Sequence, residues 1–217
     1  FKLSRFVSGS TIQSLQSVEG NRKVSRVVMF SDIRGFTAFS DSRDPASVVS
    51  TLNLILNVQT ELIHEAGGDI DKYVGDEIFA IFDGQFSALR ACEAALAIQR
   101  RISGTDPSFA GLRLGIGIHE GEVIEGVVGS ERRADYTLIG DTVNLAARFC
   151  SAAAAGEILV SESIITALKA SRGQSGVAER ISALQLRGPI RLALKGKRGE
   201  VPVFRLGPRP APKEAEA

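Results

Sequence analysis

The chain has 217 residues, 44% of them hydrophobic and 24% charged, with a formal net charge of +1. This is the ordinary balance of a soluble globular domain, long enough for one sizeable domain and short of a comfortable two. The near-zero charge argues against a protein that binds nucleic acid through bulk charge. Cys92 and Cys150 have no metal-type spacing, so we expect small buried side chains.

No apolar run reaches the ~20 residues of a membrane span, and no signal-peptide pattern is present. The sequence opens with Phe1 rather than Met. We therefore expect a cytoplasmic domain cut from a longer protein, with a regulatory region upstream and a parent protein that is either soluble or membrane-associated.

Residues 1–20 mix apolar and polar side chains and predict a short helical lead-in from that upstream region. Residues 24–30 (VSRVVMF) are rich in β-branched side chains and predict a buried strand that ends near Asp32. Gly35 then permits a tight turn, after which a helix opens at Phe36.

Asp44 and Pro45 have the pattern of an N-cap followed by proline at the first helical position. A helical stripe follows until Gly67 stops it. Residues 69–74 and 77–82 are two β-type runs across a Gly-Asp pair and predict a hairpin.

The later chain alternates between helical and strand patterns. We expect helices at 86–102, 142–149 and 161–168, and strands at 112–119, 122–128, 158–160, 181–186, 190–194 and 201–206, with a turn at Gly121. Residues 207–217 are rich in Pro, Lys, Glu and Ala and predict a disordered tail. Because two hairpins break the βαβ alternation, the sequence favours an α+β fold with a mostly antiparallel sheet.

Two aspartates stand where a charge needs a partner. Asp32 lies at the end of an apolar strand, and Asp76 lies at the tip of the hairpin. Ionised aspartate is rarely buried unless it is paired or binds a metal. Two such carboxylates at one point would suit Mg²⁺ or Mn²⁺, although each alone is equally well explained as a turn aspartate.

Three further features could bind anions. The backbone N–H groups around Phe36 and Thr37 open a helix directly after a strand. Asn144 and Arg148 share one helix face at i, i+4, and Arg suits phosphate oxygens. Lys195 lies in a basic Leu-Lys-Gly-Lys-Arg-Gly run. Alone, each has a plainer explanation: an ordinary helix start, a solvated polar face and a basic turn.

Together these segments resemble the class III adenylyl and guanylyl cyclase catalytic domains. The resemblance rests on four motifs in the family's order: residues 30–37 (FSDIRGFT), 72–76 (KYVGD), 135–148 (DYTLIGDTVNLAAR) and 194–197 (LKGK). It implies a ferredoxin-like α+β palm over residues 21–206 with two active sites shared across a dimer. The Gly-Gly-Asp at 67–69 invites a diguanylate-cyclase interpretation, but it lacks the following Glu-Phe.

The resemblance also implies roles. Asp32 and Asp76, joined by the Ile33 carbonyl, match the ligands of two divalent cations, Mg²⁺ or Mn²⁺. Asn144 and Arg148 match the pair that orients the ribose and stabilises the transition state. The remaining phosphate contacts would come from Lys195 and, where the register is loose, from Arg132 or Arg133.

Base selection falls to Lys72 and Thr137. Lys72 matches the adenine-contacting position of adenylyl cyclases, and Thr137 replaces an Asp found in many relatives, as in bicarbonate-responsive members. Guanylyl cyclases usually carry Glu and Cys at these two positions. We therefore expect conversion of ATP to 3′,5′-cyclic AMP and pyrophosphate; a guanylyl cyclase or a non-catalytic nucleotide-binding dimerisation domain are the alternatives.

The hairpin spacing favours a homodimer. Lys72 and Asp76 are four residues apart, which spans ~13 Å of strand. One would face the base and the other the metal, so one chain would have difficulty supplying both to one site. Two chains related by a two-fold axis solve this: one supplies the aspartates and the other supplies the base- and phosphate-binding residues.

Overall fold

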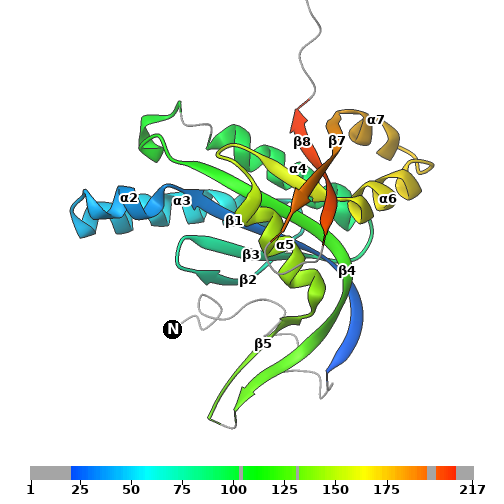
Figure 1. Cartoon of the computed structure of the whole chain (residues 1–217), viewed down its shortest axis with the longest axis horizontal. Coiled ribbons are helices and arrows are strands. Elements are labelled where there is room, and N and C mark those ends of the chain that lie inside the picture. Colours follow the sequence, from blue (N-terminus) through cyan, green and yellow to red (C-terminus); the bar gives the residue numbers. More distant parts are fainter. Residues whose placement is uncertain (1–20, 103–104, 131, 195–198, 209–217) are drawn as a thin grey trace, which may run out of the picture.

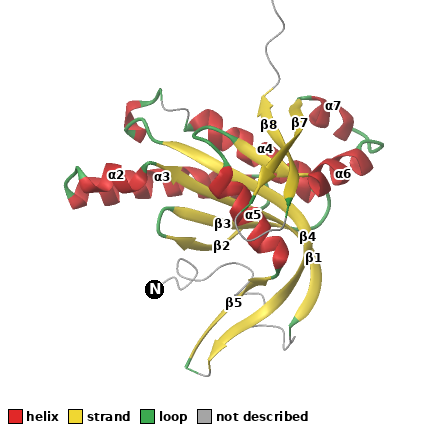
Figure 2. Cartoon of the chain, in the orientation of Figure 1, coloured by secondary structure: helices red, strands yellow, loops and turns green. Residues whose placement is uncertain are grey.

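The computed structural model describes residues 21–102, 105–130, 132–194 and 199–208. The predicted lead-in (1–20), Lys195 and residues 209–217 of the predicted tail lie outside this part of the chain. Residues 207 and 208 belong to the last strand. Figure 1 shows an open, strongly twisted sheet with helices on both faces, and Figure 2 shows the same arrangement by element type.

The predicted α+β class is confirmed. In chain order the elements are β1 (Arg22–Arg34), α2 (Phe36–Asp41), α3 (Pro45–Glu65), β2 (Asp69–Val74), β3 (Glu77–Phe82), α4 (Ser87–Arg101), η2 (Pro107–Phe109), β4 (Arg113–Ser130), β5 (Arg133–Ile139), α5 (Asp141–Ala152), β6 (Ile158–Ser161), α6 (Glu162–Ser171), α7 (Val177–Ser182), β7 (Leu184–Ala193) and β8 (Glu200–Pro208).

The sheet order is β2-β3-β1-β4-β6-β8-β7, with β5 paired to β4 beyond this path. Among the described strands only β4 and β6 pair in parallel. The predicted 69–82 hairpin is confirmed as β2 and β3. The predicted cap of α3 is also confirmed, because the Asp44 side chain accepts a hydrogen bond from the Ser47 backbone N–H.

The predicted turn at Gly121 is wrong. β4 runs unbroken through this position, where Gly121 pairs with Arg26 of β1. A Cβ there would lie 2.6 Å from Thr142 Oγ1, so this glycine serves a close approach between strand and helix. A glycine in the sequence is compatible both with a turn and with a close approach of another element to a continuous strand, so the sequence does not distinguish them.

The predicted strand at 181–186 is also wrong in its first half. Val177 and Ile181 are both buried and four residues apart, which is helical spacing, and they belong to α7. β7 then begins at Leu184 and continues to Ala193, where two strands were expected.

Two apolar layers hold the sheet. On one face, α3, α4, α6 and α7 cover the larger core, which includes Met29 and Ile33 of β1. On the other face, α5 packs over a smaller cluster that includes Val28 and Phe30. The alternation along β1 directs Asp32 to the α5 face, because it follows Val28 and Phe30 in steps of two.

Helix α3 corrects a sequence prediction. With 21 residues and a mean hydropathy of 1.2 in its best window, it meets the length and composition criteria of a membrane span. Such criteria are weak evidence, since core helices meet them too. Here Ile55 and Ile63 are fully buried in the larger core, while only 17% of the apolar window is buried. One face of α3 therefore packs on the sheet, and most of its remaining surface is uncovered in the described chain.

Gly117 sets the distance between α5 and the sheet. A Cβ on Gly117 of β4 would clash with backbone atoms of Ala146 and Cys150 in α5. Backbone atoms cannot rotate away as a flexible side chain can, so the helix seats this close only over glycine.

We predict that Gly117→Ala lowers the free energy of unfolding by about 3 kcal/mol, the upper range for overpacking, because α5 must move off the sheet. Urea denaturation measures this. Gly173→Ala is the matched control, since a Cβ there meets nothing within 4 Å, and its stability should stay near that of the wild type. Equal stabilities of both variants would contradict the prediction.

Candidate active site

Three carboxylates gather where β1 meets the β2–β3 turn. Asp32 pairs across the ladder with Glu77, and Asp76 immediately precedes Glu77. The pKa of Asp32 is raised, first by burial and then by the Asp76 carboxyl, while the Arg34 guanidinium lowers it. The two aspartates predicted to share one point are therefore brought together.

Glu77 adds to the same negative field. Burial is the main cause that raises its pKa to about 7, and the charges of Asp32 and Asp76 raise it further. Three like charges at the rim of a core repel one another and are poorly hydrated. A nearby cation would stabilise such a cluster by reducing this repulsion.

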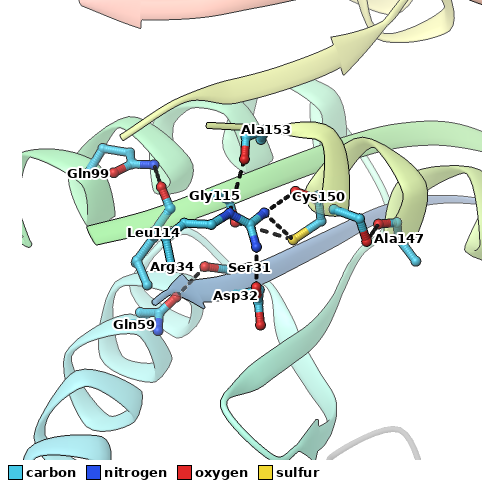
Figure 3. A network of polar contacts seen from close by, with 11 residues as sticks. Ser31, Asp32, Arg34, Gln59, Gln99, Leu114, Gly115, Ala147, Cys150 and Ala153 are labelled. Atoms are coloured by element: carbon cyan, nitrogen blue, oxygen red, sulfur yellow. Dashed lines mark hydrogen bonds and ion pairs between the residues drawn. The ribbon is translucent and has the colours of Figure 1, made fainter. Parts of the chain in front are cut away.

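Arg34 supplies one positive charge from within the chain. Figure 3 shows its guanidinium between β1 and the C-terminal end of α5. It forms an ion pair with Asp32, and its Nε donates to the Ala153 carbonyl at 3.0 Å. It also donates to the Cys150 carbonyl. Arg34 thus ties the carboxylate strand to the end of the helix, where backbone carbonyls carry partial negative charge.

A second polar cluster joins β2 to β5. Thr137 Oγ1 donates to Asp71 Oδ2 at 2.8 Å, and Lys72 Nζ lies 3.3 Å from the same oxygen. β4 bends so that β5 comes beneath β2 (Figure 1). The two residues predicted to select the base are therefore brought together, and Asp71 joins them.

Asp71 supplies the carboxylate of this cluster, and its side chain is only 1% exposed. Burial raises its pKa, whereas the Thr137 hydroxyl and the Lys72 ammonium act in the opposite direction and favour the ionised form. Its other oxygen, Oδ1, is buried and has no hydrogen-bond partner in the described structure.

Asn144 and Arg148 both lie on α5. Asn144 is exposed, and Arg148 is half-buried. Arg148 Nη1 is buried without a hydrogen-bond partner among the described residues. An unpaired guanidinium nitrogen is costly to bury, and an anionic ligand would satisfy it.

The other predicted site residues are more scattered. The Ile33 side chain is buried in the core on the face opposite Asp32, so only its backbone is available as a ligand. Phe36 and Thr37 form the first turn of α2, where Phe36 stacks on Phe39. Arg132 lies in the β4–β5 turn, at the far end of β4 from Gly115, which pairs with Asp32. Within one chain, Arg132 and Asp32 do not meet.

Comparison with known proteins identifies the family of the chain. The family described as "Adenylate and Guanylate cyclase catalytic domain" matches residues 18–206. The chain belongs to this family. Its α+β fold is that of class III cyclase catalytic domains.

Among its relatives, an adenylate cyclase of Anabaena cylindrica is 34% identical over 178 residues, covering 76% of this chain and 35% of that protein. The adenylyl cyclase CyaB from P. aeruginosa matches with a TM-score of 0.76 at 29% identity, over 87% of this chain and 96% of that one. The guanylyl cyclase Cya2 matches with a TM-score of 0.70 at 31% identity, over 88% and 96%. The cyclase domain thus spans about a third of the Anabaena protein.

Class III cyclase domains work with divalent metal ions, and the residues present fit such ions. Asp32 and Asp76 offer hard oxygen ligands, and their mutual repulsion is what a cation would relieve. Among the described residues, no group of three or more His, Cys, Asp or Glu side chains could hold a metal ion. Two carboxylates completed by substrate phosphates are the usual surroundings of Mg²⁺.

Sequence inspection missed three members of the site. Arg34 was visible as the residue two positions after Asp32, which places it on the same strand face. Glu77 follows Asp76 directly, but only the β1–β3 register places it opposite Asp32. Asp71 gave no signal, because its contact with Thr137 depends on the bend of β4.

We predict that Glu77→Gln becomes more stable relative to the wild-type cyclase as pH rises. The folded-state pKa of about 7 lies above the ordinary 4.5, so folding favours the protonated form, and ionisation costs stability between these two values. Urea denaturation without divalent cations should show little difference near pH 4.5 and a growing advantage of the variant up to pH 8. Exposed Glu65→Gln is the control, and a pH-independent difference for Glu77→Gln would contradict the prediction.

Proposed function

We propose that this cyclase domain is an adenylyl cyclase that converts ATP to 3′,5′-cyclic AMP and pyrophosphate as a homodimer. The observation that carries the proposal is the meeting of Asp32 and Asp76 at one point on the α5 face of the sheet. Two adjacent carboxylates are suited to hold cations beside a triphosphate.

When bound, two divalent cations would neutralise the triphosphate and make the ribose 3′-hydroxyl a better nucleophile. The chain itself supplies positioning and charge. Asp32, Asp76 and the Ile33 carbonyl would hold the ions, and Asn144 would orient the ribose. Arg148 would face the α-phosphate, where charge grows during attack of the 3′-oxygen. Its unpaired Nη1 supports this assignment.

The preference for ATP rests on Lys72 and Thr137. Adenine offers N1 as an acceptor and its 6-amino group as a donor. Lys72 can donate to N1, and Thr137 can accept from the amino group. Guanine has the reverse pattern and would leave both unsatisfied, which is the costly outcome. The pairing of Lys72 and Thr137 through Asp71 supports their action on one base.

Surface composition supports the homodimer. Large apolar side chains are exposed at the end of β2 and along the β4–β5 arm: Tyr73, Val74, Ile124, Val127, Val128 and Ile139. Exposed apolar surface, where it is extensive, commonly marks an interface. In a two-fold dimer, one chain would bring its carboxylates to the partner's Lys72, Thr137, Asn144 and Arg148. Arg132 and Lys195 would add phosphate contacts, with Phe36 and Thr37 offering backbone N–H groups.

Other parts of the proposal concern the longer protein. The curated relatives extend well beyond this domain, which covers 35% of the Anabaena protein. We propose an upstream regulatory region and a cytoplasmic location for the catalytic domain.

The direct test is incubation with Mn²⁺ and either ATP or GTP, followed by identification of the product by mass spectrometry. We expect cyclic AMP and pyrophosphate from ATP and at least tenfold less cyclic GMP from GTP, the scale of one unsatisfied hydrogen bond. Asp76→Asn should abolish turnover, because half of the carboxylate pair is lost. Cyclic GMP as the main product would make this a guanylyl cyclase, and no cyclic product would refute the proposal.

The shared site has its own test. Asp32→Ala and Arg148→Ala homodimers should each lose about 10²-fold or more in kcat. Mixing equal amounts should restore about a quarter of the wild-type activity, because half of the dimers then have one intact site. Verified heterodimers without regained activity would show that each chain builds its own complete site.

A further inference from the structure

The cluster of Asp71, Lys72 and Thr137 contains a carboxylate that the proposed chemistry does not use. Asp71 touches both proposed base-selecting side chains through one oxygen, Oδ2. Its burial is expensive because Oδ1 has no partner in the described structure. A buried oxygen without a hydrogen bond lowers stability, so Asp71 is not explained as a stabilising residue and its contact with Thr137 suggests another role.

Resting on the proposed function, we propose that Asp71 is the positioning residue that sets adenine preference, by fixing the direction in which the Thr137 hydroxyl hydrogen-bonds. An ionised carboxylate can only accept hydrogen bonds. The 2.8 Å contact therefore takes the single proton of Thr137 Oγ1. What remains on that hydroxyl is an oxygen with lone pairs and no proton to donate.

This polarity discriminates between the two purines. A hydroxyl that can only accept suits the 6-amino group of adenine, which donates. The O6 of guanine is an acceptor, so it would face the lone pairs of the Thr137 oxygen and form no hydrogen bond with it. A free threonine hydroxyl could rotate to serve either base, because it is both donor and acceptor. Thr137 alone is ambiguous, and Asp71 removes the ambiguity.

Asp71 also constrains Lys72. The ion pair at 3.3 Å holds the ammonium beside Thr137 while its side chain stays 37% exposed and accessible to a ligand. An ammonium has three N–H donors, so Lys72 can serve Asp71 and still donate to N1 of adenine. Both polar contacts to the base are then set by one buried carboxylate.

The test is Asp71→Asn, which keeps the shape and adds an N–H₂ donor. The amide can donate to Thr137 and free its proton to face guanine O6. We expect the ratio of kcat/KM for ATP to that for GTP to fall about ten- to hundredfold, the effect of losing a hydrogen bond to a charged group. Most of the change should lie in KM for ATP, because base contacts are made equally in ground and transition states. A merely structural role would instead lower kcat for both nucleotides alike and leave the ratio unchanged, which would overturn the proposal.

Two further variants keep the test decisive. Asp69→Asn removes a carboxylate two positions earlier on the same strand and should keep the wild-type ratio. Asp71→Ser removes the charge with a smaller side chain and replaces Asp71→Asn if that variant does not fold. In a double-mutant cycle, Asp71→Asn introduced into the Thr137→Val variant should change the ratio far less than it does in the wild type, because Asp71 acts mainly through the Thr137 hydroxyl. Equal effects of Asp71→Asn in both backgrounds would overturn the proposal.

The outcomes separate this proposal from the function on which it rests. If the wild type makes no cyclic AMP, the proposed function fails. If the wild type makes cyclic AMP and Asp71→Asn keeps its ATP-to-GTP ratio, the adenylyl cyclase stands and the role of Asp71 is refuted.

Discussion

The repulsion among Asp32, Asp76 and Glu77 is the constraint around which the active face is organised. Three carboxylates at the edge of an apolar core lower stability when they are ionised, and burial and mutual repulsion accordingly raise the pKa of both Asp32 and Glu77. Within the described chain, Arg34 offsets part of this cost through its ion pair with Asp32. The remaining negative charge is available to cations, and a triphosphate is the ligand that brings cations with it.

Arg34 also connects the carboxylates to helix α5. Its guanidinium reaches the Ala153 and Cys150 carbonyls at the end of α5, while Gly117 lets the same helix seat directly on β4. Arg148 is therefore carried by a helix fixed to the carboxylate strand at one end and packed backbone to backbone near its middle. Catalysis by positioning requires this, because displacements of about 1 Å are costly in rate.

Much of the fold could be predicted from local patterns. The β2–β3 hairpin, the Asp44 cap of α3 and the helix carrying Arg148 each have signals within a few residues. The predictions of secondary structure were wrong where one residue type is compatible with two kinds of local structure. Gly121 was expected to turn the chain, yet it lets Thr142 approach a continuous strand. The predicted strand began at Ile181, and the helical spacing is visible only when Val177, four residues earlier, is included.

For the site, the sequence could indicate residues but not their partners. The motif around Asp32 and Asp76 was visible, whereas the opposition of Asp32 and Glu77 depends on strand register. Asp71 and Thr137 are separated by 66 positions and meet only because β4 bends. A residue that acts on a site only by contacting another side chain has no sequence motif, because a residue from any distant part of the chain can make such a contact.

In the proposed function, one polar cluster would recognise the base and the other would bind the cations. Asp32, Asp76 and Glu77 concentrate negative charge, whereas Lys72 and Thr137 present a donor and an acceptor around a single buried carboxylate. Lys72 lies within β2 and contacts Asp71, whereas Asp76 lies in the turn that follows Val74. In the proposed dimer, a nucleotide held at its phosphates by the carboxylates of one chain would place its base on Lys72 and Thr137 of the partner chain. Apolar side chains exposed on β2 and β5 belong to the same strands as Lys72 and Thr137, so association of two chains through these strands would bury that surface and, in the proposed function, complete the site. Dimerisation and substrate recognition would then depend on the same strands.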